Sequence, residues 1–284
     1  MITISILLLS LVVGFYFLAF VFYLSELLTA GRKSSSWGGR FLEIGFVFHT
    51  FAVFVHAFTA SQAAPLRFYL PVTTVGAVSG FFAWSLAFIY LVLVRRLKTE
   101  GFGLILVPVL VFFLIPAFFP FRENELVSRH FHDLYFLLHI LSAFFGFSSF
   151  ALSFIAGALY WVQDRVLKKK IGGHFYHKFP YLEDLERFVF RTIFWGVLLL
   201  VGAILTGALW TKSAFGTFFL REPKALASVL TWCVYLVIIY LHEVSMIKGK
   251  RLVLMSVGAF LLVLFTFWGT SVLQIGPHLH AGVW

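Results

Sequence analysis

The chain has 284 residues, of which 61% are hydrophobic and only 12% are charged. Soluble domains average roughly 45–50% apolar and about 25% charged residues, so this composition excludes a soluble enzyme, a disordered chain and a nucleic-acid-binding domain. The net charge of +10 comes from 22 Lys and Arg against 12 Asp and Glu, and the single cysteine, Cys233, excludes an internal disulfide and a Cys-based zinc or iron–sulfur site.

Eight apolar stretches are long enough to cross a bilayer, which takes about 20 helical residues. They cover residues 2–30, 41–63, 69–94, 102–120, 131–163, 188–211, 225–247 and 252–275. The first stretch has no basic segment before it and no charge before Glu26, which favours a retained helix over a cleaved signal peptide. We therefore predict an all-α membrane protein, a polytopic bundle of about eight transmembrane helices forming one domain over residues 1–284.

Basic residues alternate between successive loops. Loops one, three, five and seven hold 16 Lys and Arg, whereas the remaining loops hold 6. The positive-inside rule then places the odd-numbered loops in the cytoplasm and both termini outside, and the excess charge indicates contact with anionic lipid. Residues 164–187 form the longest cytoplasmic basic loop, and the amphipathic run at 180–187 favours an interfacial helix leading into the sixth span.

Histidines are the best candidates for chemistry because acidic groups are scarce in the spans. His49 and His56 lie seven residues apart in the second span, so they share a face at a separation of about 10 Å. His139 lies about two turns inside the fifth span and His242 near the cytoplasmic end of the seventh, and His278 and His280 follow the last span. Neutral imidazole is a common metal ligand and an axial ligand of haem iron, although each histidine alone equally fits a packing role.

The depths of these histidines suggest two pairs. His49 and His242 are expected in the inner half of the bilayer, whereas His139 and His280 are expected at the outer surface. With 38 Phe and 8 Trp in the chain, this pattern indicates two sites for a planar apolar ligand with an iron centre.

Other motifs are weaker. The chain has no HExxH, GxSxG or Walker sequence. His130 with His132 and His174 with His177 are minor metal-site candidates, and Gly76-x-x-x-Gly80 indicates close helix contact.

An aromatic segment at 210–225 follows the sixth span on the outer side. Its apolar residues are typical either of a ligand platform or of an aromatic belt at the membrane interface. The basic residues around them could neutralise haem propionates or contact lipid phosphates. The aromatic and glycine positions are Trp210, Phe215, Gly216, Phe218 and Phe219, and the basic positions are Lys212, Arg221 and Lys224.

At this segment the chain resembles the cytochrome c assembly superfamily, the haem-handling membrane proteins of the CcsA, CcmC and CcmF type, and within it the eight-span HemX-like branch. The family's external W-G-x-Y-W-x-W-D-P-K-E segment is matched by the run 215–225, in which every tryptophan is replaced, one of them by Arg221. The other matches are Leu138-His139, Thr231-Trp232, Tyr240-Leu241-His242 and the run 276–282.

This resemblance implies a haem b protein of the bacterial inner membrane that transports or presents haem for cytochrome c assembly, or controls haem biosynthesis. His139 and His280 would hold haem over the aromatic segment, and His242 with His49 would form the intramembrane pair, with His56 and His278 as rivals. Trp210 and Trp232 would border the haem. The resemblance implies no catalytic residue, and it implies an assembly protein or apocytochrome as partner. Two other interpretations remain open: a bis-His haem electron-transfer subunit of a membrane oxidoreductase, and a non-haem transporter.

Overall fold

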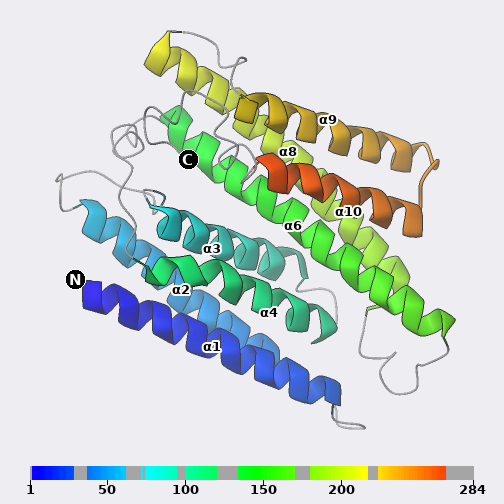
Figure 1. Cartoon of the computed structure of the whole chain (residues 1–284), viewed down its shortest axis with the longest axis horizontal. Coiled ribbons are helices and arrows are strands. Elements are labelled where there is room, and N and C mark those ends of the chain that lie inside the picture. The colour runs from blue at the N-terminus through cyan, green and yellow to red at the C-terminus, as the bar shows by residue number, and fades with distance from the viewer. Residues whose placement is uncertain are drawn as a thin grey trace. The chain divides into compact units, whose positions relative to one another are not determined.

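The structure is a computed structural model that describes residues 2–28, 37–61, 72, 74–94, 100–119, 134–169, 180–216 and 223–266. All regular elements in these ranges are helices (Figure 1). They divide into two compact units, which are described separately. Unit 1 comprises Met1–Glu123 and Val162–Asp184, and unit 2 comprises Asn124–Trp161 and Leu185–Trp284.

The described part of unit 1 contains four complete α-helices and one short 3-10 helix, together with the last turns of a helix that ends at Lys168 and the first residues of one that begins at Leu182. The complete elements are α1 (Ile2–Leu28), α2 (Trp37–Ser61), α3 (Val75–Val94), α4 (Glu100–Leu114) and η1 (Ile115–Phe118). Helix α1 packs against α2 and α4, and α3 packs against α4 and η1. The close contact predicted at Gly76 is present, because a Cβ atom there would lie 2.7 Å from the Pro116 carbonyl oxygen.

Two buried tyrosines of α1 lie directly against glycines of neighbouring helices. A Cβ atom added to Gly45 of α2 would lie 2.7 Å from the Tyr16 ring. A Cβ atom added to Gly38 of α2 would lie 2.7 Å from the Tyr23 ring, and both tyrosines are buried. A Cβ atom on Gly103 of α4 would approach Tyr23 to within 2.3 Å. The missing side chains therefore allow α1 to pack closely on both neighbours.

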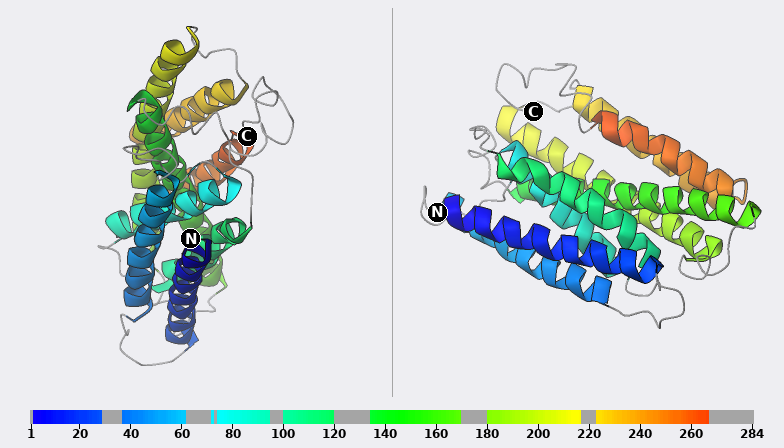
Figure 2. Two further views of the ribbon diagram at one scale, coloured as in Figure 1. Left: turned by 90° about the vertical axis from the view of Figure 1, so that its left-hand side faces the viewer. Right: turned by 60° about the horizontal axis from the view of Figure 1, so that its bottom comes forward.

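Unit 2 contains α6 (Leu134–Lys168) as far as Trp161, α8 (Leu182–Phe215) from Leu185, α9 (Pro223–Glu243) and α10 (Lys250–Leu264). Helices α9 and α10 lie side by side (Figures 1 and 2). Figure 2 shows the same pairing from a second direction.

The interior of unit 2 combines aromatic stacking with paired hydroxyl groups. Phe150 of α6 stacks on Tyr235 of α9 at 3.9 Å between ring centroids, and the Phe150 ring lies against Gly196 of α8. Ser153 of α6 and Ser256 of α10 form a buried hydrogen bond of 2.5 Å between their Oγ atoms. Such pairs satisfy hydroxyl groups that lipid cannot solvate.

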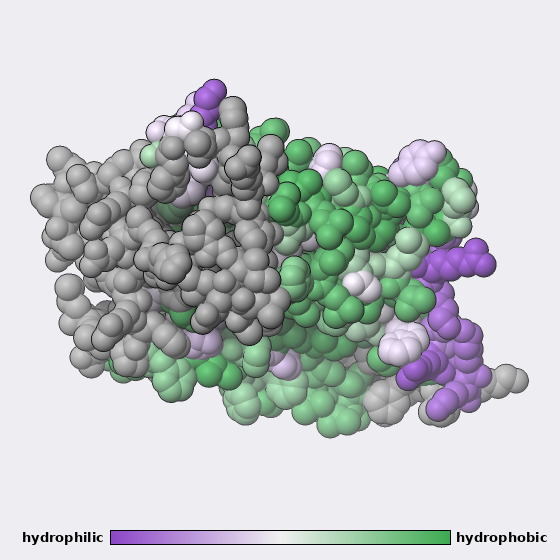
Figure 3. Space-filling model, turned by 45° about the horizontal axis from the view of Figure 1, so that its top comes forward, coloured by the Kyte–Doolittle hydropathy of each residue, from purple (hydrophilic) through white to green (hydrophobic). Residues whose placement is uncertain are grey.

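The predicted fold class is confirmed: the chain is a multi-pass helical membrane protein. Seven described helices are long and apolar enough to span a membrane. Helix α10 is described over 15 residues, and residues 267–275 of the eighth predicted span lie outside the described residues. Figure 3 shows hydrophobic residues over most of the described part of one face. Exposed apolar side chains that suit contact with lipid include Leu7, Phe17, Val47, Phe54, Leu205 and Leu261.

Some helix limits differ from the predicted spans. Helix α6 continues to Lys168, where a 2.7 Å ion pair joins Lys168 to Asp164 one turn earlier. The amphipathic run at 180–187 is not a separate interfacial helix, because from Leu182 onward it is continuous with α8. Helices α6 and α8 have 35 and 34 residues, or about 50 Å each, well beyond the roughly 30 Å of a bilayer core.

Substitution of Gly103 tests the close packing on Tyr23. We expect Gly103→Ala to lower the stability of the protein in detergent by about 1–3 kcal/mol, because the added methyl group overlaps a buried ring. Thermal unfolding of the purified protein measures the effect. The matched control is Gly14→Ala in α1, where a Cβ atom meets nothing within 4 Å and the helix gains up to about 1 kcal/mol. Equal unfolding midpoints for the two variants would contradict the packing described for Tyr23.

Candidate haem-binding site

His139 is held against the backbone of α8. It lies in the second turn of α6, and its Nδ1 atom is 2.7 Å from the carbonyl oxygen of Ala203. A Cβ atom on Gly207, one turn further along α8, would lie 2.6 Å from the same Nδ1 atom. The imidazole therefore lies on α8 at a position that only glycine leaves open.

This hydrogen bond determines which ring nitrogen carries the proton. A carbonyl oxygen only accepts hydrogen bonds, so Nδ1 of His139 is the donor. In the neutral ring the lone pair then resides on Nε2. Metal-binding histidines commonly use this arrangement, in which one nitrogen donates to a carbonyl and the other is the ligand.

Aromatic side chains adjoin His139 along both helices. Phe136 precedes it by one turn of α6 and is buried, and Trp210 follows Gly207 by one turn of α8. The Phe136 and Trp210 rings are 4.9 Å apart between centroids, with an interplanar angle of 50°. We call Phe136, His139, Gly207 and Trp210 the α6–α8 cluster.

His242 lies in the last turn of α9 and stacks on Phe190 of α8. The two ring centroids are 4.1 Å apart with an interplanar angle of 27°. The Nδ1 atom of His242 is buried and has no hydrogen-bond partner among the described residues. Buried polar atoms are nearly always hydrogen-bonded or bound to a metal, so a water molecule or a metal ion would satisfy this nitrogen. We call His242 and Phe190 the α8–α9 cluster.

His49 is buried in unit 1 and has a protein partner. Its Nδ1 atom is 3.2 Å from the hydroxyl oxygen of Tyr16, which is itself fully buried, and the ring also faces the backbone of Gly80. Binding iron through Nδ1 requires His49 to give up the bond to Tyr16. His56 is half-buried two turns further along α2. Because His49 belongs to unit 1 and His242 to unit 2, their pairing stays a prediction.

The remaining predicted positions are only partly described. Trp232 of α9 is half-buried, and its Nε1 atom has no hydrogen-bond partner among the described residues. Phe215 is the last residue of α8, and Gly216 follows it with a φ of 73° and an N–H group that donates to the Lys212 carbonyl. Phe218, Phe219, His278 and His280 lie outside the described residues.

Sequence reasoning missed Ala203, Gly207, Phe190 and Tyr16, which contact the candidate histidines. Gly196 and Gly207 lie about three turns apart along α8 and therefore on one face of it, and this spacing was the available signal for a close helix approach. Nothing in the sequence indicates which ring would lie there, because the pairing of helices is a tertiary property.

Comparison with known proteins identifies the family. The family described as "Cytochrome C assembly protein" matches residues 72–278 of this chain, which contain both clusters. The chain belongs to the cytochrome c assembly protein family.

Known proteins with two different names resemble this chain. It is 27% identical to "Protein HemX" of Brevibacillus brevis over 92% of this chain and 93% of the relative, and 24% identical to "Protein HemX" of Bacillus subtilis (strain 168) over 89% and 90%. It is 26% identical to "Cytochrome c biogenesis protein CcsA" of Lobularia maritima over 42% of this chain and 38% of the relative. No solved structure matches the chain.

The tautomer of His139 is directly testable. In nitrogen-15 NMR of the histidine-labelled protein in detergent, we expect the His139 ring, assigned by its loss in His139→Ala, to be protonated at Nδ1 only. Gly207→Ala should disturb this signal, because the added methyl group displaces the ring from Ala203. Gly258→Ala, where a Cβ atom meets nothing within 4 Å, is the control. A His139 ring protonated at Nε2 in the unmodified protein would contradict the described hydrogen bond.

Proposed function

We propose that this protein binds haem b through histidines and carries or presents haem for cytochrome c assembly or for the control of haem biosynthesis. The observation that carries the proposal is the α6–α8 cluster, in which Ala203 fixes the tautomer of His139 beside Phe136 and Trp210. Membership of the cytochrome c assembly family supports a haem-related role in the membrane.

The side chains in both clusters suit haem. Neutral imidazoles are axial ligands of haem iron, and aromatic rings shield the macrocycle from water and lipid. His139 would contribute Nε2, while Ala203 and Gly207 orient the ring. The buried Nδ1 atom of His242 lacks a partner among the described residues, which supports a second site. Haem, when bound, would supply an iron that accepts imidazole ligands and a reversible one-electron couple.

Each haem would need a second histidine ligand, and we choose these from the predicted depths of the histidines in the bilayer. We propose His280, with His278 as rival, as the partner of His139, and His49, with His56 as rival, as the partner of His242. Lys212 is exposed near the C-terminal end of α8. Its ammonium group would neutralise a propionate of a haem held by His139. These residues bind and orient; none of them is proposed to catalyse a reaction.

The topology and partners are also proposals. The concentration of Lys and Arg in the odd-numbered loops supports both termini on the outer side of a bacterial cytoplasmic membrane. The α6–α8 cluster, at the start of α6 and the end of α8, would then face the outer compartment. Relatives named as cytochrome c biogenesis proteins support an apocytochrome or an assembly protein as the recipient of haem.

Absorption spectra of variants test this function. In oxidised and dithionite-reduced spectra of the detergent-purified protein, we expect haem b bands that weaken in His139→Ala, weaken separately in His242→Ala and vanish in the double variant. His174→Ala is the matched control, because the proposal gives His174 no role.

Two results would contradict the proposal. A clean preparation from haem-replete cells without haem bands would remove haem binding and favour a non-haem transporter. Haem that is bound but never passes to an added haem-scavenging acceptor protein would instead favour a permanent electron-transfer subunit.

A further inference from the structure

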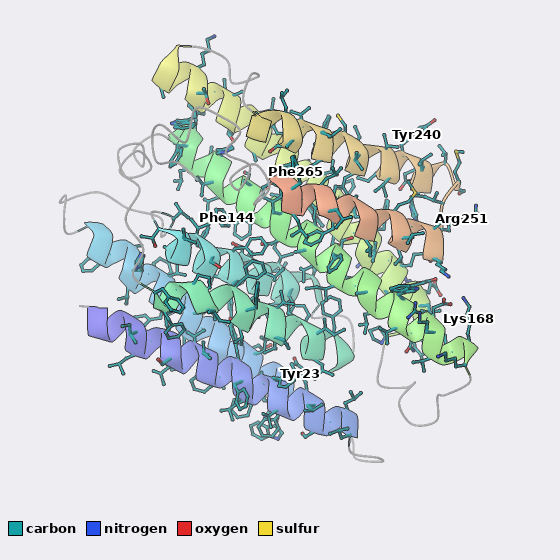
Figure 4. The ribbon with its side chains drawn as sticks, in the orientation of Figure 1. Tyr23, Phe144, Lys168, Tyr240, Arg251 and Phe265 are labelled. Atoms are coloured by element: carbon teal, nitrogen blue, oxygen red, sulfur yellow. The ribbon has the colours of Figure 1, made fainter. Side chains whose placement is uncertain are left out.

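The turn that follows His242 is folded tightly onto the end of α9. The N–H group of Ser245 donates to the His242 carbonyl at 2.9 Å, and the N–H groups of Met246 and Ile247 donate to the Leu241 carbonyl at 2.9 and 3.2 Å. These hydrogen bonds connect the turn to Leu241 and His242. A contact that restrains the turn therefore also restrains the end of α9. Figure 4 labels Tyr240 and Arg251 on either side of this turn.

Glu186 of α8 holds the far end of the same turn. Its Oε1 atom accepts a 2.6 Å hydrogen bond from the N–H group of Gly249, the residue directly before α10. The carboxylate thus lies at the N-terminus of α10, where the helix dipole favours negative charge. Lys248, Lys250 and Arg251 surround Gly249 in the sequence and add to this preference.

Gly249 is suited to this contact. Its φ of 55° and ψ of −127° lie where side chains are strongly disfavoured. A Cβ atom on it would also lie 3.2 Å from the hydroxyl oxygen of Tyr160, a buried residue of α6. The start of α10 is therefore enclosed by α6 and α8.

Glu186 and Phe190 lie four residues apart, on one face of α8. Phe190 stacks on the His242 ring, and Glu186 binds the backbone seven residues beyond it. One face of α8 therefore contacts both the imidazole and the turn that carries it.

We propose that Glu186 is a positioning residue for His242: by anchoring the turn at Gly249, it keeps the imidazole stacked on Phe190 in a fixed orientation. The consequence for haem rests on the function proposed above, in which His242 is an axial ligand. The anchoring involves only contacts between residues of this chain, so it can be tested without haem.

The first test uses apo protein in detergent, labelled with carbon-13 in histidine. Stacking on Phe190 shifts the His242 ring signal, which His242→Ala identifies. We expect Glu186→Ala to move this signal toward the unstacked position, whereas Glu186→Gln retains an acceptor oxygen and preserves it. Glu183→Ala, which removes an exposed carboxylate one turn earlier, is the matched control. His139 of α6 lies against the other end of α8, so the signal of its ring reports whether each variant is folded.

The second test uses His139→Ala protein loaded with haem, so that binding at His242 is measured separately. Adding Glu186→Ala should weaken haem binding about tenfold and change the spin state of the bound haem, in line with the loss of a charge-assisted hydrogen bond. Glu186→Gln in place of Glu186→Ala keeps a neutral acceptor for the Gly249 N–H group, so we expect a smaller loss of binding and a smaller change of spin state.

The outcomes separate the two proposals. An unmoved His242 ring signal in a folded Glu186→Ala variant overturns the positioning role, whatever the haem result. If Glu186→Ala moves the His242 ring signal but leaves haem binding and spin state unchanged, Glu186 does not position His242 for haem. A moved signal in a protein that binds no haem at all supports the anchor and instead overturns the proposed function.

Discussion

Helices in both units approach closely where a glycine lets an aromatic or imidazole ring lie on a neighbouring backbone. Tyr16 lies on Gly45, Tyr23 on Gly103, Phe150 on Gly196 and His139 on Gly207. In a bilayer the hydrophobic effect does not favour one helix pairing over another, so association depends on such close packing and on satisfied polar groups. The helix packing within each unit and the orientation of His139 depend on this one constraint.

The two candidate histidines of unit 2 are held by contacts of different kinds. His139 is fixed by a hydrogen bond to the Ala203 carbonyl, so its protonation at Nδ1 and its lone pair at Nε2 are set by the backbone of α8. His242 is fixed by stacking on Phe190 and by the turn that Glu186 binds. The buried Nδ1 atom of His242 has no hydrogen-bond partner among the described residues, whereas Nδ1 of His49 is bonded to Tyr16 and would have to give up that bond to bind a metal.

The sequence predicted the fold class and the family because both depend on features spread along the chain. Apolar runs of about 20 residues mark spans wherever they occur, and the ordered segments around His139 and His242 identify the cytochrome c assembly family. The extents of α6 and α8 were not predicted, since charged residues such as Asp164 and Glu186 resemble loop residues until their partners are known. Contacts such as His139 with Gly207 could not be predicted, because no local pattern states which helices are neighbours.

We propose that the backbone of α8 prepares His139 to bind haem iron through Nε2. A cryo-electron microscopy structure of the haem-loaded protein tests this claim most directly. We predict an iron about 2 Å from Nε2 of His139, as for other metal–imidazole bonds, with Nδ1 still bonded to the Ala203 carbonyl. Iron bound through Nδ1 of His139, or haem bound with no bond to His139, would contradict this proposal.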